Sequence, residues 1–373
     1  MRRPLAKIVM DRVHIGLAVS VIALLVFGSL MVSLATATMA GHAALVQRQF
    51  VGIGVGMLFL VGVWLIDYTS YKAWTGPLMI LLSVLIISPR IPGIGSTAKG
   101  ATSWLQIGGV TLFQPSEPAK LLFIVIMAAV IAEFSGKIEK WPDVAKVAAY
   151  VAWPFLLILL QPDLGTGLVF IMISMGMLLV GGLKGRWFGV AAALIAIVAV
   201  VGLTTPLLQT YQKDRLLVFI DSTRDPKGAG YNLAQSKIAI GAGGWTGTGM
   251  QGGTQSRLNF IPERHTDFIF SVLGEQFGFL GAMMLLGLYL ALLSAALSIS
   301  ASSRDLFGAL IAAGLLSMWL FQILENIGMT IGIMPITGIP LPFMSYGSSF
   351  MVTNLAGVGM LLSIWSRRYG TGK

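Results

Sequence analysis

The sequence predicts an all-α polytopic membrane protein, and three observations lead to that class. The chain has 373 residues, of which 56% are hydrophobic and 11% charged, whereas a soluble chain carries about 25% charged residues. Apolar runs of about 20 residues, the length that crosses a bilayer as a helix, recur along most of the chain. The sequence contains no cysteine and three histidines, which excludes a disulfide scaffold and a thiolate metal site.

Ten apolar runs are predicted to span the membrane as helices. They cover about residues 15–36, 49–67, 74–92, 113–134, 144–161, 164–182, 187–207, 268–299, 305–331 and 346–366. The third is the weakest, because Pro92 and a Gly/Ser-rich stretch blur its end. The corner Gln161–Asp163 between the fifth and sixth runs predicts a tight hairpin, with Asp163 as an N-cap. The first run is too long for a signal-peptide core and is predicted to be an uncleaved anchor.

Positively charged residues predict that both termini are cytoplasmic. Cytoplasmic loops of membrane proteins carry an excess of Lys and Arg. With the N-terminus inside, the tails and the short loops on that side hold 14 such residues: Arg2, Arg3, Lys7, Arg12, Lys72, Lys137, Lys140, Lys146, Lys184, Arg186, Arg304, Arg367, Arg368 and Lys373. The opposite short loops hold Arg48, Arg90 and Lys99. The formal net charge of +10 is therefore an orientation signal, and no nucleic-acid partner is predicted.

The chain is predicted to form a single membrane domain, 1–373, with one large extracytoplasmic loop, 208–267, between the seventh and eighth spans. A short helix is expected within it at Tyr231–Ile240. The Gly-rich run Gly241–Gly253 contains a formal GxGxxG, but no strand precedes it and no acidic residue follows at the spacing of a dinucleotide site. We interpret it as a flexible or tightly turned loop. The uncharged, Pro-rich segment 335–347 is expected to fold back into the bundle.

Ionisable residues at membrane depth are costly, so each is a functional candidate. Glu117 and Lys120 lie three residues apart at the outer start of the fourth span, on one helix face. They form either a self-neutralising pair or part of a site, and both alternatives stay open. Glu275 lies two turns into the eighth span. Glu325 lies deep in the ninth span, before Asn326, where a hydrogen bond to a neighbouring helix is preferred over a functional role.

Asp267 is the strongest catalytic candidate. It ends the large loop and opens the eighth span, where the helix dipole favours an ionised carboxylate. An N-cap is the alternative explanation. However, Glu263, Arg264, His265 and Asp267 fall within five residues, which is dense polarity for so apolar a chain. A carboxylate at the mouth of a membrane cavity is well placed to act as a general base.

Nine motifs in order resemble the SEDS (shape, elongation, division, sporulation) family over nearly the whole chain. They are Thr102–Gly108, Phe113–Lys120, Gln161–Thr166, Gly230–Gln235, Ala239–Gly244, Gly253–Ser256, Phe260–Phe270, Leu273–Gly278 and Thr337–Gly347. Gly253–Ser256 is similar to the elongation branch rather than the division branch. Two positions depart from the family pattern, Gln276 in place of Glu and Ser348 in place of Gly.

The resemblance implies a peptidoglycan glycosyltransferase that polymerises lipid II for cell elongation and rod shape. It implies a site on the outer face of the bacterial cytoplasmic membrane and a class B penicillin-binding protein, a PBP2-type transpeptidase, as partner. The key acidic residue of the family matches Asp267, which we interpret as the base of an inverting transfer. A flippase or transporter of the same lipid-linked precursor is the main alternative, although the sequence shows no inverted repeat. A non-catalytic scaffold is a third.

The leaving pyrophosphate requires positive charge. Lys120, oriented by Glu117, is the buried candidate for this contact. Four arginines of the large loop are further candidates for this contact, and the sequence does not rank them: Arg215, Arg224, Arg257 and Arg264. His265, Ser345 and Tyr346 are candidates for lining the cavity. No motif requires a cofactor, but a divalent cation, Mg²⁺ or Mn²⁺, bridging Asp267 and the pyrophosphate is left open because such cations prefer hard oxygen ligands.

Overall fold

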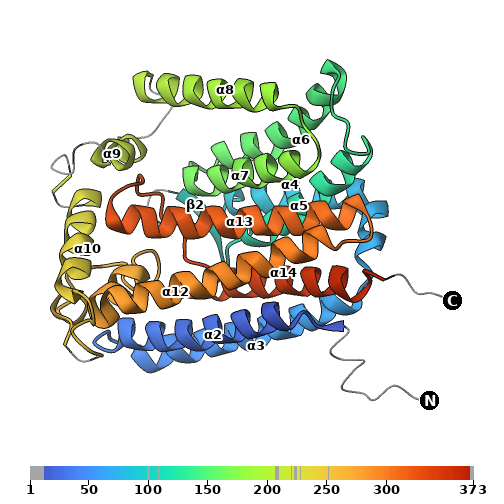
Figure 1. Ribbon diagram of the computed structural model, residues 1–373. Helices are drawn as coiled ribbons and strands as arrows, with labels where there is room; N and C mark the ends of the chain where they lie inside the picture. The colour runs from blue at the N-terminus through green and yellow to red at the C-terminus, as the bar shows by residue number, and fades with distance from the viewer. Residues whose placement is uncertain are drawn as a thin grey trace, which may run out of the picture.

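The computed structural model describes residues 12–98, 101–107, 110–205, 210–219, 221, 225–226, 228–250 and 252–369. In this part of the chain, long apolar helices form a bundle (Figure 1). Its α-helices are α2 (Ile15–Thr36), α3 (His42–Leu65), α4 (Thr75–Ile87), α5 (Ser116–Ala132), α6 (Trp141–Leu159), α7 (Leu164–Val180), α8 (Gly185–Thr204), α9 (Thr210–Val218), α10 (Ala229–Gly243), α11 (Thr254–Arg257), α12 (Ile269–Ala301), α13 (Leu306–Ile331) and α14 (Ser348–Ser366). The 3₁₀ turns η1 (Tyr68–Trp74) and η2 (Ser88–Arg90) flank α4, and the strands are β1 (Gly95–Ala98), β2 (Ala101–Ile107) and β3 (Val110–Phe113).

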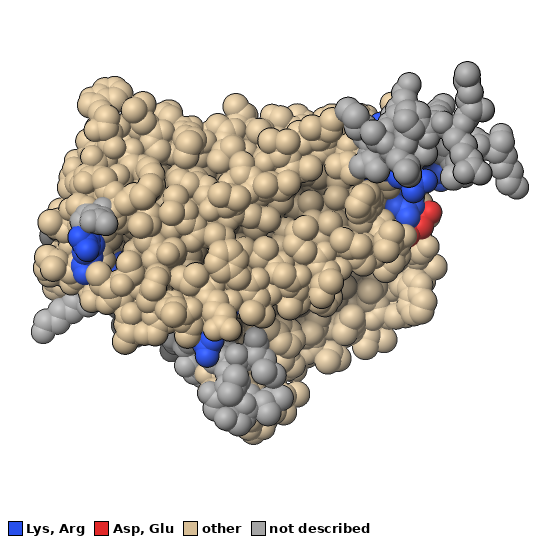
Figure 2. Space-filling view, turned by 90° about the horizontal axis from the view of Figure 1, so that it is seen from below, with Lys and Arg blue, Asp and Glu red and all other residues tan. Residues whose placement is uncertain are grey.

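The structure confirms a polytopic membrane protein. Among the described residues, seven helical segments are long and apolar enough to cross a membrane, and α7 is a shorter apolar helix of 17 residues. The seven are α2, α3, the segment Tyr68–Arg90, α6, α12, α13 and α14. A helix lies at each of the ten predicted positions, while the number that crosses the bilayer stays a prediction. Figure 2 shows a face almost free of charged side chains, with the charges gathered near its edges, as expected of a surface in contact with lipid.

The centre of the bundle is built on α13 and α14, the most deeply buried of these spans. Small residues let α14 approach α3 closely, as is common between membrane helices. A Cβ at Gly56 of α3 would lie 2.5 Å from Leu355 Cδ1, and one at Gly359 of α14 would lie 2.5 Å from the carbonyl oxygen of Leu60. The polar side chains inside the bundle are mostly paired; for example, Trp319 Nε1 donates to Asn354 Oδ1 at 2.7 Å.

A small antiparallel sheet of order β1-β2-β3 between α4 and α5 was not predicted. Gly95 pairs with Leu105, and Leu105 in turn pairs with Phe113 across the second ladder. The strands are only four to seven residues long. Their irregular registers interrupt the alternation of apolar and polar residues that marks longer strands, so the sheet depends on pairing across the loop rather than on a sequence pattern.

The short helix predicted within segment 208–267 is confirmed as α10, and the Gly-rich run of this segment is tightly turned against α12. Thr248 N donates to the carbonyl oxygen of Glu275 at 2.9 Å. A Cβ at Gly247 would lie 2.1 Å from the carbonyl oxygen of Gln276, so only glycine fits. α12 bends at this contact, where Gly278 has φ 62°. The run therefore serves backbone packing and not a dinucleotide.

The two ends of the bundle differ in content. At one end the start of α2 meets the end of α14, with the His14 and Trp365 rings 4.6 Å apart. At the other end lie α9, α10, the start of α12 and the end of α13 (Figure 1). The segment 335–347 follows α13 here and is folded into the bundle as predicted, with Leu341, Phe343 and Ser345 fully buried. This second end carries the candidate site.

Candidate active site at the start of α12

Asp267 is buried, with 8% of its surface exposed. It lies two residues before α12, whose N-cap position is occupied by Phe268. Asn326 of α13 holds its backbone, because Asn326 Nδ2 donates at 2.8 Å to the carbonyl oxygens of both Asp267 and Ile339. The amide therefore joins three segments: the end of the large loop, α13 and the folded-back segment 335–347. Asp267 is fixed by contacts that only the folded bundle supplies.

The folded-back segment is bound directly to the residues before Asp267. Ser345 Oγ donates to the carbonyl oxygen of Thr266 at 2.6 Å and accepts a hydrogen bond from Leu341 N at 2.8 Å. Tyr346 N donates to the carbonyl oxygen of His265 at 2.9 Å, and the two rings lie 5.5 Å apart. Ser345 and Tyr346 thus hold the segment in place beside Asp267, and Ser345 has no exposed surface.

Arg215 is the loop arginine that the structure brings to Asp267. A Cβ at Gly338 would lie 3.3 Å from Asp267 Oδ2 and 3.9 Å from Arg215 Nη1, so the carboxylate and the guanidinium converge on the same glycine. Arg215 belongs to α9, which is tied to the hairpin between α6 and α7 because Gln212 Nε2 donates to the carbonyl oxygen of Pro162 at 2.9 Å. The absence of a side chain at Gly338 leaves room for both groups, and its φ of +78° also favours glycine.

The other arginine candidates are placed differently. Arg264 is buried; its Nε donates to the carbonyl oxygen of Ala35 at 2.6 Å and its Nη2 to Thr38 Oγ1 at 3.1 Å. Burial lowers the pKa of the Arg264 guanidinium, but arginine keeps its charge in proteins. These contacts direct Arg264 to the end of α2. Arg257 is exposed on α11, and Arg224 lies outside the described residues.

Glu117 and Lys120 form the predicted ion pair at the start of α5. Lys120 Nζ lies 2.9 Å from Glu117 Oε1 and 2.9 Å from Oε2, and the two residues are 3% and 4% exposed. Lys120 Nζ also lies 5.5 Å from the centre of the Phe350 ring of α14. The self-neutralising arrangement is therefore present, and the positive charge of Lys120 is balanced by Glu117 within the protein.

Glu275 caps α11, a short helix within segment 208–267. Its Oε1 accepts from Gln255 N at 2.7 Å and its Oε2 accepts from Ser256 N at 2.9 Å. Both oxygens of this fully buried carboxylate thus satisfy backbone amides of α11, as carboxylates do at helix N-termini. A functional role for Glu275 is not needed to explain its place inside the membrane protein.

Glu275→Gln is expected to loosen α11 without removing the loop. Gln keeps one acceptor oxygen but loses the charge-assisted pair, and hydrogen bonds to charged groups contribute about 1.5–3 kcal/mol each. Hydrogen exchange at the amides of Gln255 and Ser256 should accelerate, while exchange within α13 should not change. Equal protection of these amides in the variant and the wild type would show that the cap does not hold α11.

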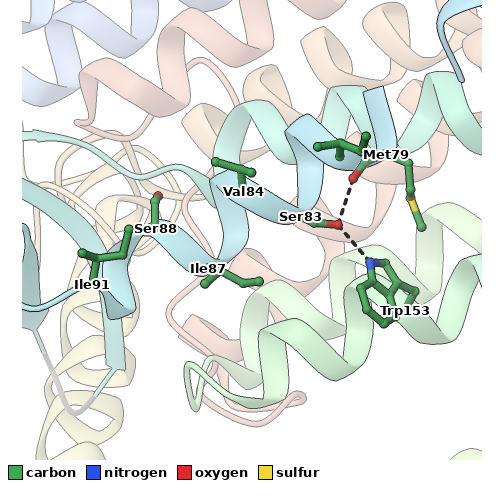
Figure 3. A pocket seen from close by; sticks show the side chains of 8 residues that line it. Met79, Ser83, Val84, Ile87, Ser88, Ile91 and Trp153 are labelled. Carbon is green, nitrogen blue, oxygen red and sulfur yellow. Dashed lines mark hydrogen bonds between the residues drawn. The ribbon is translucent and has the colours of Figure 1, made fainter. Parts of the chain in front are cut away.

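One apolar pocket lies away from Asp267. It has a volume of about 680 Å³ and lies between α4 and α6, where Ile80, Val84, Ile87 and Trp153 line it (Figure 3). Trp153 Nε1 donates to Ser83 Oγ at 2.9 Å on its wall. No ionisable side chain lines this pocket, so it cannot supply a proton acceptor. In the described part of the chain, no group of three or more His, Cys, Asp or Glu side chains could hold a metal ion.

Two residues of this site, Thr337 and Gly338, were not predicted. Both lie in the family motif Thr337–Gly347, in which only Ser345 and Tyr346 were candidates. Gly338, a glycine within the apolar segment 335–347, was the feature of the sequence that could have pointed to this part of the site. Glu325 was expected to bond a neighbouring helix, but its Oε1 instead accepts a hydrogen bond from Thr337 Oγ1 in the folded-back segment.

Known proteins resemble the chain along nearly its whole length. The family model described as cell cycle protein, FtsW/RodA/SpoVE, matches residues 12–369. Peptidoglycan glycosyltransferase MrdB of Escherichia coli (strain K12) is 37% identical over 368 residues, which cover 98% of this chain and 97% of that protein.

Solved structures agree with this likeness. A chain from "Structural coordination of polymerization and crosslinking by a peptidoglycan synthase complex" has a TM-score of 0.80 and 31% identity and covers 96% of this chain and 98% of its own. Rod shape determining protein RodA of Thermus thermophilus has a TM-score of 0.70 and 28% identity, with 95% and 97% covered. The motifs, the fold and these matches together show that the chain belongs to the FtsW/RodA/SpoVE, or SEDS, family.

Proposed function

We propose that the protein is a peptidoglycan glycosyltransferase that polymerises lipid II into glycan strands for cell elongation and rod shape. The observation that carries this proposal is the convergence of the Asp267 carboxylate and the Arg215 guanidinium on Gly338. A proton acceptor and a fixed positive charge are the two groups that a glycosyl transfer with a pyrophosphate leaving group needs. The likeness to MrdB, a named peptidoglycan glycosyltransferase, supports the same reaction.

In the proposed reaction, Asp267 accepts the proton of the 4-hydroxyl group of a GlcNAc acceptor as that oxygen attacks the anomeric carbon of MurNAc. The new carbon–oxygen bond forms with inversion, and the bond to the pyrophosphate breaks. Undecaprenyl pyrophosphate then leaves with both bonding electrons. Arg215 stabilises its negative charge, as fixed cations do for leaving phosphoryl groups. Arg215 is preferred to Lys120 for this contact because the Lys120 charge is already balanced by Glu117.

The proposed site opens on the extracytoplasmic side of the bacterial cytoplasmic membrane. The excess of Lys and Arg in alternate short loops supports cytoplasmic termini. The start of α12 would then lie at the outer surface. A class B penicillin-binding protein is the proposed partner, in line with the solved chain from a complex that joins polymerisation and crosslinking.

The test uses purified protein with its class B partner and labelled lipid II in detergent. Glycan polymer formed by the protein supports the proposal. Liposomes that contain the protein and lipid II provide the second arm. Movement of lipid II across the liposome membrane without polymer in the first arm would contradict the proposal and favour the flippase.

Chelation tests whether the reaction uses the divalent cation that the sequence leaves open. The described residues form no cage of three acidic or histidine ligands, so a cation would be held jointly by Asp267 and the pyrophosphate oxygens, which are hard ligands suited to Mg²⁺ or Mn²⁺. EDTA is therefore expected to lower polymer formation while the thermal unfolding temperature of the free protein stays unchanged. Full activity in EDTA would exclude the cation, and a lower unfolding temperature would indicate a site within the protein itself.

A further inference from the structure

Two adjacent residues of α13, Glu325 and Asn326, form hydrogen bonds with the folded-back segment 335–347 on either side of Gly338. Glu325 Oε1 accepts from Thr337 Oγ1, and Asn326 Nδ2 donates to the carbonyl oxygen of Ile339 at 2.8 Å. Gly338, which faces Asp267 and Arg215, lies between these two attachment points. The same Asn326 amide also holds the carbonyl oxygen of Asp267. These hydrogen bonds from one turn of α13 therefore hold the residues on both sides of Gly338 as well as the backbone of Asp267.

Glu325 is an unusual residue for this position. It is the one charged residue in the sequence of α13 and is 1% exposed. Its Oε2 is buried and has no hydrogen-bond partner among the described residues. A buried carboxyl group with an unpaired oxygen is costly, and the hydrogen bond from Thr337 satisfies its other oxygen.

We infer that Glu325 is a positioning residue for the transfer reaction: it holds Thr337, and with Asn326 it sets the backbone of Gly338 against Asp267 and Arg215. This inference rests on the proposed function. Its chemistry is indirect, because Glu325 acts through Thr337 and touches no reacting atom. The position of Gly338 decides how far the Asp267 carboxylate lies from the Arg215 guanidinium, which is proposed to stabilise the leaving pyrophosphate. A misplacement of about 1 Å at a reacting centre can lower the rate about 10²-fold.

The test compares Glu325→Leu, Glu325→Gln, Thr337→Val and the double variant Glu325→Leu/Thr337→Val in the lipid II assay with the partner present. Leu and Val remove the hydrogen bond at similar volume, and Gln keeps an acceptor oxygen for Thr337. We expect roughly 10- to 100-fold lower kcat for Glu325→Leu and for Thr337→Val, with little change in KM. Glu325→Gln should recover most of the rate, and the double variant should be no slower than the slower single variant, because both changes remove one contact.

Ser317→Ala is the matched control. Ser317 Oγ donates to the carbonyl oxygen of Ala313 within the same helix at 2.8 Å, so its loss should leave kcat unchanged. Wild-type kcat in Glu325→Leu would overturn the inference, as would rate losses of the two single variants that multiply in the double variant. A Glu325→Gln variant as slow as Glu325→Leu would also overturn it, because the charge and not the contact would then matter.

Hydrogen exchange separates this inference from the proposed function. Glu325→Leu and Thr337→Val should accelerate exchange at the amides of Gly338 and Ile339, whereas Ser317→Ala should not. This measurement needs no turnover, so it tests whether the contact between Glu325 and Thr337 holds the segment even if the wild type forms no polymer. Unchanged exchange at both amides in both variants would show that Glu325 does not hold the segment.

Discussion

Replacing Asp267 with Asn is expected to lower glycan polymer formation by about 10²–10⁴-fold, the range that a positioned general base contributes. Asn has nearly the same volume, but its amide cannot accept the proton of the attacking hydroxyl group. Asn326 holds Asp267 through its backbone carbonyl oxygen, so the substitution does not remove that contact. The loss should therefore be one of chemistry rather than of folding, with kcat reduced and the thermal unfolding temperature close to that of the wild type.

Asp305→Asn provides the matched control for that experiment. Asp305 is the N-cap of α13, and its carboxylate accepts hydrogen bonds from Gly308 N at 2.8 Å and from the Tyr68 hydroxyl at 2.7 Å. Asn is as good an N-cap as Asp, so polymer formation should be retained. Equal activity of Asp267→Asn and the wild type would refute the role of Asp267 as the base while leaving the polymerase activity in place.

Replacing Lys120 with Met is expected to destabilise the protein by about 3–5 kcal/mol, the cost of leaving one member of a buried ion pair without its partner. Met fills a similar volume, but Glu117 would then keep a buried charge with no counter-charge 2.9 Å away. The double variant Glu117→Gln/Lys120→Met removes both charges and should regain most of the lost stability. Unfolding in mixed detergent micelles, followed by circular dichroism, measures the difference.

The same double variant decides between the two interpretations of the pair. If it is stable and polymerises lipid II, the ion pair between Glu117 and Lys120 has only a structural role in packing α5, and neither charge is needed for the reaction. If it is stable but inactive, Lys120 binds the substrate. A Lys120→Met variant as stable as the wild type would show that the pair adds no stability, which would contradict the expected cost of an unpaired buried charge.

Features that depend on neighbours in sequence were predicted well. A helix lies at every position where an apolar run predicted one, because a helix that crosses the bilayer needs about 20 mainly apolar residues. Asp163 caps α7 as expected, with Thr166 N donating to its Oδ1 at 3.0 Å. The ion pair between Glu117 and Lys120 followed from their spacing of three residues on one helix face. Each of these depends on spacing along a single element.

The sequence by itself determined the helical membrane class, the family and the place of Asp267 at the start of a span. The tertiary structure alone decided which arginine lies beside Gly338 together with Asp267, since Arg215, Arg257 and Arg264 have the same side chain and differ in where the fold carries them. It also decided that Glu275 caps α11 and that Glu325 holds Thr337. The physical reason is that hydrophobic periodicity is read within one segment, whereas a hydrogen bond or ion pair between distant segments exists only once the bundle has packed.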